Sequence, residues 1–217
     1  MPSSDRTPIP QIILIGAGGH GRACIDVIEQ EGRYAIAGLV DRRGAEAESG
    51  TLGYPVLGTE DDLAELRSRY DHALLTVGGI YSAALRDRVR LFARLRELDF
   101  TLPVVVSPLA YCSPHAHVGE GTILMHRAVV NLGAHIGVNC IINTASLLEH
   151  DVQVGDHTHI APMGALNGKA CVGSRSFVGS NATVMNEVVL PDDSFVRAGQ
   201  LVISPQDVRR TNERRKR

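Results

Sequence analysis

A six-residue period in the second half of the chain constrains the fold more than any other feature of the sequence. From Val106 to Val202, every sixth residue is Val, Ile or Leu, with Cys112 as the exception. The residue four places after each of these is mostly small, as Ala128 and Ser146 illustrate. A period of six matches neither the turn of an α-helix nor the alternation of an ordinary strand.

This period is typical of a parallel β-helix, in which each six-residue repeat needs stacked neighbours to bury its apolar side chain. We expect each repeat to form one flat side of a triangular prism. The aliphatic residue should point inward, and the small residue should let the chain turn the corner. Three sides then close one coil of about 18 residues, so that residues one coil apart stack along the axis.

The first half of the chain alternates short apolar segments with helical ones, which predicts a small parallel sheet of Rossmann type. The expected strands are 11–15, 35–40 and 72–77, and the expected helices are 22–30, 59–69 and 82–98. The last helix should place four apolar residues on one face, namely Leu85, Val89, Phe92 and Leu95.

Charge and hydropathy argue against several functional classes. The net charge of −2 gives no basic surface for nucleic acid. No apolar run reaches the ~18 residues of a membrane span, and the first ten residues lack the apolar core of a signal peptide. The four cysteines have no C-x-x-C spacing, so we expect reduced thiols in a cytoplasmic protein rather than a disulfide or a metal site.

A glycine-rich loop follows the first expected strand. Gly16, Gly18 and Gly21 fit the pattern G-x-G-x-x-G between a strand and a helix, and Asp41 follows the second strand. Glycines in this place let backbone N–H groups approach phosphate at a helix N-terminus. The loop therefore indicates a nucleotide ligand. Because only about three strands precede the repeats, NAD would lack its second half-site, and a nucleotide-sugar is favoured over NAD and over a purely structural turn.

Over residues 10–203 the chain resembles the bacterial sugar O/N-acyltransferases, which join a small nucleotide-sugar domain to a left-handed β-helix. The resemblance rests on the loop from Gly16 to Gly21 and on the segment from Asn143 to His159. The best-known members N-acetylate UDP-4-amino-sugars with acetyl-CoA, and related members belong to bacillosamine, sialic acid and perosamine pathways. The resemblance implies the left-handed prism, acetyl-CoA as donor, and a homotrimer with the acetyl-CoA site between adjacent subunits.

Four segments are expected from these observations. They are a flexible N-terminus at 1–10, a Rossmann-like nucleotide-sugar-binding domain at 11–103, a left-handed β-helix acyltransferase domain at 104–203, and a basic tail at 204–217. The tail departs from the family, many of whose members end in Gly-x-Pro-Ala-Arg.

Acetyl transfer to an amine needs a base, because the amine loses a proton as it attacks the thioester carbonyl. Histidine suits this role, since it ionises near neutrality. The resemblance assigns the base to His150 and its supporting carboxylate to Asp151, with Glu149 as the alternative. By spacing alone, His150 could equally be a polar residue on a solvated edge. Four other histidines match no motif and are expected to be exposed on the prism, namely His115, His117, His126 and His135.

The resemblance also implies the binding residues. His159 corresponds to a histidine that contacts acetyl-CoA, and Ser180 and Ala198 fall where backbone groups contact the same molecule. The expected substrate-binding residues are Gly18, Gly19, His20, Asp41, Arg42 and Gly78. Arg42 replaces the second acid of the family's pair, and the segment 79–81 replaces a common Asn or Asp.

Three functions are compatible with these features. The favoured one is an acetyl-CoA-dependent N-acetyltransferase acting on a nucleotide-activated amino-sugar, with a UDP-4-amino-sugar as the expected acceptor. The second is a sugar O-acetyltransferase of the sialic-acid type, which would need the same base and the same donor. The third is a non-catalytic nucleotide-sugar-binding homologue, against which His150 followed by Asp151 argues.

Overall fold

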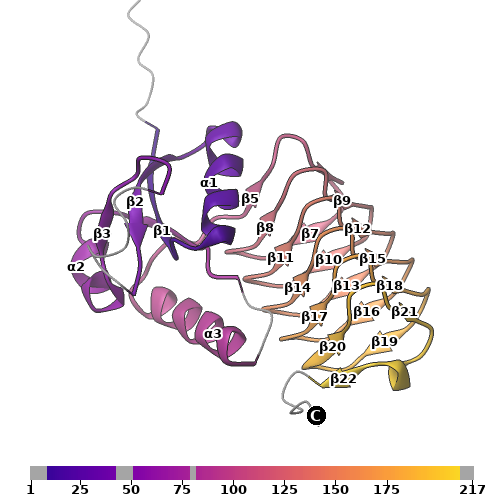
Figure 1. Cartoon of the computed structure of the whole chain (residues 1–217). Coiled ribbons are helices and arrows are strands. Elements are labelled where there is room, and N and C mark those ends of the chain that lie inside the picture. Colours follow the sequence, from indigo (N-terminus) through magenta and orange to yellow (C-terminus); the bar gives the residue numbers. More distant parts are fainter. Residues whose placement is uncertain (1–8, 43–50, 79–81, 211–217) are drawn as a thin grey trace, which may run out of the picture.

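The computed structural model describes residues 9–42, 51–78 and 82–210 of the 217-residue chain. An α/β domain packs beside a prism of short strands (Figure 1). The domain has a parallel four-stranded sheet in the order β3-β2-β1-β4. Its strands are β1 (Gln11–Ile15), β2 (Ala35–Val40), β3 (Val56–Gly58) and β4 (His72–Leu75). Its helices are α1 (Gly19–Glu31), η2 (Glu60–Asp62), α2 (Leu63–Arg67) and α3 (Ser82–Glu97).

Each strand and helix expected in this domain is present, β1 and β2 with the expected ends and the others with shifted ends. Helix α1 begins three residues before the expected start at Arg22, directly at the glycine loop. Thr59 and Asp62 form a capping box at the start of η2, in which the Thr59 backbone N–H donates to Asp62 Oδ2 at 2.7 Å. The sequence analysis missed β3, because this short, half-buried edge strand has no alternating pattern.

The prism has three parallel faces, which we number in the order in which the chain visits them. The first face contains β5 (Val105–Val106), β8 (Ile123–Leu124), β11 (Ile141–Ile142), β14 (His159–Ile160), β17 (Phe177–Val178) and β20 (Ser194–Val196). The second face contains β6 (Tyr111–Cys112), β9 (Val129–Val130), β12 (Leu147–Leu148), β15 (Ala165–Leu166), β18 (Thr183–Val184) and β21 (Leu201–Val202). The third face contains β7 (His117–Val118), β10 (His135–Ile136), β13 (Gln153–Val154), β16 (Cys171–Val172) and β19 (Val189–Leu190).

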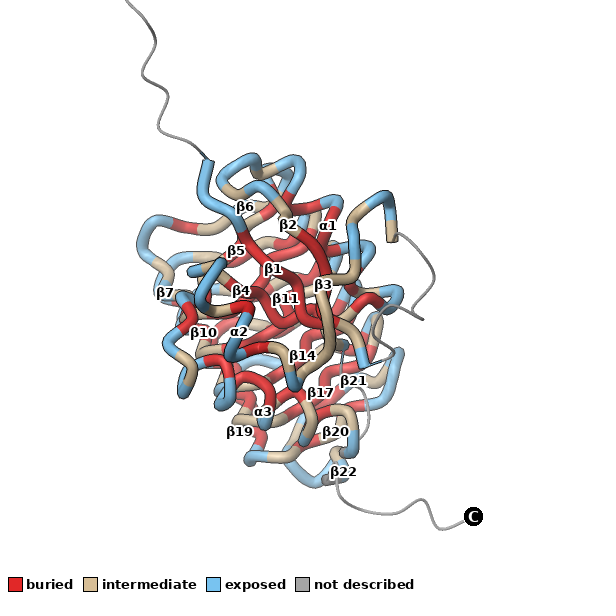
Figure 2. The backbone as a smooth tube through the Cα atoms, turned by 90° about the vertical axis from the view of Figure 1, so that its left-hand side faces the viewer, coloured by how far each residue is buried: buried red, intermediate tan, exposed pale blue. Residues whose placement is uncertain are grey.

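The strand pairing confirms the predicted register. Each strand pairs with the strand one coil later, so that Ile142 lies beside Ile160 and Leu148 lies beside Leu166. The aliphatic residues at six-residue intervals from Leu124 to Val202 are at most 3 % exposed and form the core of the prism. Figure 2 shows the buried residues running along the strands, with exposed residues at the turns.

The corners show how the chain turns, and they refine the sequence interpretation. From Gly121 to Gly199, one residue in every six has a positive φ, for example Asp151 at 60° and Arg175 at 56°. This left-handed residue makes the turn. The small residue that follows it, such as Ala128, is instead packed into the prism core, where the corner leaves little room.

The α/β domain packs against the first face of the prism. Ile123 and Ile141 share one buried cluster with Ile25 of α1. A polar link lies beside it, in which His126 Nε2 is 2.7 Å from Asp26 Oδ2 and His126 Nδ1 is 2.6 Å from Ser107 Oγ. The prediction that His126 is an exposed surface residue is therefore wrong, because Asp26 is 100 residues away in sequence and no local pattern reveals it. The other three histidines are exposed as expected, namely His115, His117 and His135.

A buried arginine joins the two parts of the molecule. Arg88 on α3 is 2 % exposed, and its Nη1 donates to the carbonyls of Leu75 at 3.1 Å and Val77 at 2.7 Å. Its Nε and Nη2 donate to the carbonyl of Asn139 in the prism. Burial lowers the pKa of the Arg88 guanidinium to about 10, so it is still charged at neutral pH. Arg88 and Leu91 are buried on this helix, whereas Val89, which the sequence placed there, is half-buried.

Replacing Arg88 by Met should lower the free energy of unfolding by about 3 kcal/mol, because three buried carbonyls lose their donor. Chemical denaturation followed by circular dichroism measures this change. The matched control is Arg86→Met. Arg86 is an exposed arginine on the same helix, so this change should alter the free energy of unfolding by less than about 0.5 kcal/mol. Equal midpoints for the two variants would contradict the role of Arg88 as the link.

The C-terminal residues close the end of the prism. After η3 (Pro205–Asp207), strand β22 (Arg209–Arg210) pairs antiparallel with β20. The expected tail at 204–217 therefore begins later than the sequence suggested, because its first residues form these two elements. Its remainder from 211 lies outside the described residues, as do the first eight residues of the chain and the segment 79–81.

Candidate functional site

A pocket of about 550 Å³ lies at the carboxyl ends of the strands in the α/β domain. This is where open α/β sheets hold their ligands. Six of the residues that line it are those expected to bind substrate, namely Gly18, Gly19, His20, Asp41, Arg42 and Gly78. The structure therefore brings this set together at one place.

The glycine loop leaves the pocket open beside the N-terminus of α1. Gly18 caps the helix, and the first helical turn has no acidic residue, so it presents free N–H groups and a positive potential. A Cβ atom at Gly18 or Gly19 would meet no atom within 4 Å. A Cβ atom at Gly21 would collide with the Gly16 carbonyl. Gly21 is thus needed for packing, whereas Gly18 and Gly19 keep space free for a ligand.

Charged residues form the outer wall of the pocket. Asp41 Oδ2 accepts a hydrogen bond from the backbone N–H of Ala17 at 3.2 Å, which ties the end of β2 to the loop. Arg42 pairs with Asp87 at 2.8 Å and with Glu60 at 3.4 Å. The hydrogen bond from Arg42 lowers the pKa of the Asp87 carboxyl. Sequence reasoning missed Glu60 and Asp87, because they come from separate helical segments and belong to no local motif.

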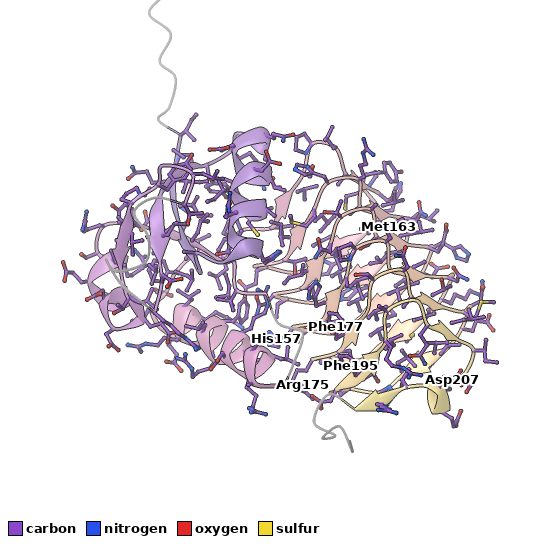
Figure 3. All side chains as sticks on the ribbon, in the orientation of Figure 1. His157, Met163, Arg175, Phe177, Phe195 and Asp207 are labelled. Carbon is purple, nitrogen blue, oxygen red and sulfur yellow. The ribbon has the colours of Figure 1, made fainter. Side chains whose placement is uncertain are left out.

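His159 lies on the first face, next to this pocket. Its ring centroid is 6.4 Å from that of His20 and 5.2 Å from that of Phe177. Its Nε2 is 3.1 Å from Asn143 Nδ2. Phe177 stacks on Phe195 one coil later, and Figure 3 shows both rings on the prism beside α3. His159 is therefore a buried residue at the junction of the two parts of the chain.

His150 lies elsewhere, at the edge between the second and third faces. It occupies the turn between β12 and β13, and its side chain is 48 % exposed. Its Nδ1 is 3.0 Å from Asp151 Oδ2. Glu149 instead accepts a hydrogen bond from Asn131 Nδ2 at 3.1 Å. Asp151, rather than Glu149, is thus the carboxylate that contacts the imidazole of His150.

Two glycines make room for this pair. A Cβ atom at Gly168, one coil after His150, would lie 2.5 Å from His150 Nε2. A Cβ atom at Gly133, one coil before Asp151, would collide with Asp151 Oδ1. The His–Asp pair therefore sits in a slot along the edge where neighbouring coils carry no side chain.

The expected site residues thus fall into separate places on one chain. Ser180 and Ala198 lie in turns at the edge between the first and second faces, one coil apart. The pocket lies in the α/β domain, which packs on the first face, and His159 lies on that face, opposite the edge that carries His150. A single chain therefore does not bring His150 to the glycine-loop pocket.

Known proteins match the chain along most of its length. Residues 11–89 match the PglD N-terminal domain family. The GDP-perosamine N-acetyltransferase of Escherichia coli O157:H7 is 25 % identical over 182 residues, which cover 81 % of this chain and 78 % of that protein. The acetyltransferase domain of PglB from Neisseria gonorrhoeae, solved with acetyl coenzyme A, is 26 % identical with a TM-score of 0.80, covering 94 % of this chain and 100 % of that one.

PerB from Caulobacter crescentus, solved with CoA and GDP-perosamine, is 32 % identical with a TM-score of 0.82, covering 91 % of this chain and 90 % of that one. The chain belongs to the hexapeptide-repeat sugar N-acetyltransferases. This acetyltransferase therefore has the predicted α/β domain and left-handed β-helix. The CoA and acetyl-CoA bound in its relatives confirm the donor that the resemblance implied. In the part of this acetyltransferase that the structure describes, no helix is long and apolar enough to cross a membrane.

Proposed function

We propose that this protein transfers the acetyl group of acetyl-CoA to the amino group of a nucleotide-activated amino-sugar. His150 is the general base, and Asp151 orients it. The observation that carries the proposal is the His150–Asp151 pair, held at 3.0 Å in a glycine-lined slot on the prism of an acetyltransferase.

The glycine-loop pocket supports a nucleotide-sugar as the acceptor. Its volume suits such a ligand. The N-terminus of α1 would hold the diphosphate, and Asp41 at the end of β2 is placed for a ribose hydroxyl. Leu91 offers an apolar surface to the nucleobase. Two relatives are named for GDP-perosamine or hold it, and the sequence resemblance points to UDP-4-amino-sugars. Both are nucleotide-linked amino-sugars, which is the class that we propose.

The chemistry follows from the His–Asp pair. The amine nitrogen attacks the thioester carbonyl and forms the new C–N bond, while its proton passes to His150 Nε2. The C–S bond then breaks, and the thiolate of CoA takes the proton from the His150 imidazolium, which restores the base. Asp151 accepts the Nδ1–H of His150, which leaves the lone pair on Nε2 to take up the proton of the amine.

The surface of the prism supports an oligomer. Most of the large exposed apolar side chains lie on the second face or its two edges, and a face of this kind marks an interaction surface. They are Leu109, Tyr111, Leu132, Met163, Met185, Leu201 and Ile203.

We propose a homotrimer in which the second face of each prism turns toward the threefold axis. In a closed ring, the edge between the second and third faces of one prism meets the edge between the first and second faces of the next. This would bring His150 of one subunit to Ser180 and Ala198 of its neighbour, beside that neighbour's His159 and nucleotide pocket. Acetyl-CoA would bind between the two subunits.

Gly18→Val should raise KM for the nucleotide-sugar roughly tenfold or more, because the side chain would occupy the space of the phosphate. KM for acetyl-CoA and the melting temperature should stay unchanged, since a Cβ at this position meets no protein atom. Gly21→Ala is the contrasting variant and should lose stability, because its methyl group collides with the Gly16 carbonyl. Initial rates and thermal melts measure both. An unchanged KM in Gly18→Val, or binding of NAD in place of nucleotide-sugars, would contradict the assignment of the pocket.

Thiol release from acetyl-CoA in the presence of UDP-, dTDP- and GDP-linked amino-sugars tests the proposed function. We expect one of these acceptors to release thiol and to yield a product one acetyl group heavier. An amide product is stable to mild alkali, whereas an ester is cleaved. An alkali-labile product would favour the sugar O-acetyltransferase, and thiol release with none of the acceptors would favour a non-catalytic homologue.

A further inference from the structure

A histidine and a cysteine on α1 form a contact that the proposed catalytic step does not use. His20 lines the nucleotide pocket, and Cys24 lies one turn later on the same helix. Cys24 Sγ is 3.5 Å from His20 Nε2. Cys24 is 0 % exposed, and burial raises the pKa of its thiol to about 12, so the sulfur carries its proton at neutral pH.

The surroundings keep the His20 ring neutral. Among the described residues, the titratable and charged groups that act on or contact it are Cys24 on α1, Arg88 on α3 and His159 on β14. Burial, then the positive charge of Arg88, then His159 lower the pKa of His20 to about 3. No carboxylate of the described residues is among the groups that act on His20, in contrast to His150 with its Asp151. His20 is therefore not suited to act as a base.

The contact with Cys24 decides which nitrogen of His20 carries the proton. A protonated thiol has one S–H to donate, and its sulfur is a weak acceptor. A neutral imidazole has one acceptor nitrogen and one donor nitrogen. Of the two arrangements that this contact allows, the S–H of Cys24 donating to Nε2 is the stronger, because sulfur is a weak acceptor, and in it the ring proton is on Nδ1. Among the described residues, Nδ1 forms no hydrogen bond, although the side chain lines the pocket.

We propose that Cys24 is a positioning residue that holds His20 in the Nδ1–H tautomer, and that His20 donates from Nδ1 to a diphosphate oxygen of the nucleotide-sugar. This inference rests on the proposed function, because it describes how the same pocket holds the acceptor. The N–H groups at the start of α1 and the Nδ1–H of His20 then face the same phosphate group. Because the ring is neutral, this donor is present throughout the neutral pH range.

Kinetics separate this role from a purely structural one. Cys24→Ala should raise KM for the nucleotide-sugar about three- to tenfold with KM for acetyl-CoA unchanged, because Nε2 loses its donor and the tautomer is no longer held. Cys24→Ser should restore KM to within about twofold, because a hydroxyl also donates. A purely structural role predicts the opposite order, since serine is the worse residue at a buried apolar position. A KM in Cys24→Ser equal to or above that of Cys24→Ala would overturn the proposal.

Nitrogen NMR of histidine-labelled protein tests the tautomer directly. The His20 signals, assigned with a His20→Gln variant, should show a protonated Nδ1 and an unprotonated Nε2 from about pH 5.5 to 8.5. In Cys24→Ala, this single tautomer should become a mixture. The opposite tautomer or a protonated ring in this range would overturn the proposal. Failure of the proposed function would give a different result. The wild-type protein would release no thiol with any acceptor, while its His20 spectrum would still depend on Cys24.

Discussion

Replacing His150 by Ala should lower kcat by about 10²–10⁴, the usual contribution of a positioned general base. The fold should be unchanged, because the His150 side chain is half-exposed at an edge and lies outside the six-residue core register. Asp151→Asn should cost less, because an imidazole remains to accept the proton, although its tautomer is less well controlled. Thiol release at saturating concentrations of both substrates measures these effects.

Two further variants sharpen this test. Gly168→Ala should also lower kcat, although His150 is still present. The added methyl group would lie 2.5 Å from His150 Nε2 and would therefore push the imidazole out of its position. His117→Ala is the matched control, since His117 is exposed on the third face, stacks on His135 and lies in no part of the proposed site. Full activity of His150→Ala, or an equal loss in His117→Ala, would sink the assignment of the base.

Leu147→Asp should convert the proposed trimer to monomers and lower activity by roughly 100-fold or more, because each proposed site needs groups from two chains. Leu147 is the first residue of β12, in the middle of the second face, where a charge would have to be buried in the interface. Gln153→Asp is the matched control, one face further along the same coil, and should remain trimeric and active. Light scattering at micromolar concentration measures the assembly. A monomeric wild-type protein with full activity would rule out the shared site.

The sequence predicted those features that depend on local spacing. The six-residue period predicted the three-faced prism, because the register of each strand repeats that of the strand one coil earlier, as Leu148 and Leu166 show. The glycine loop predicted the pocket, because strand, loop and helix N-terminus are contiguous in the chain. Contacts between distant residues could not be predicted in this way. The burial of Arg88 depends on carbonyls of two domains, and the link between His126 and Asp26 crosses 100 residues.

The proposed interface did leave a signal that the sequence interpretation did not use. The outward residues of the second face recur every 18 positions and are mostly apolar, as Tyr111, Leu147 and Leu201 show. The corresponding positions of the third face include His117, His135 and Gln153. Grouping the outward residues by their 18-residue spacing therefore distinguishes a face that is suited to association from one that is suited to solvent.

Complementation between two variants tests most directly whether the site is shared between chains. The first variant, His150→Ala, lacks the proposed base. The second is the double variant Gly18→Val/Gly19→Val, which has an intact His150 but a blocked pocket, and it is assayed at a nucleotide-sugar concentration far below its raised KM. The two chains are co-expressed with different tags, and mixed trimers are purified on both tags. Every such trimer has one junction that joins an intact His150 to an intact pocket, so about a third of wild-type activity should return, although neither parent is active. Mixed trimers no more active than their parents would contradict a site built from two chains.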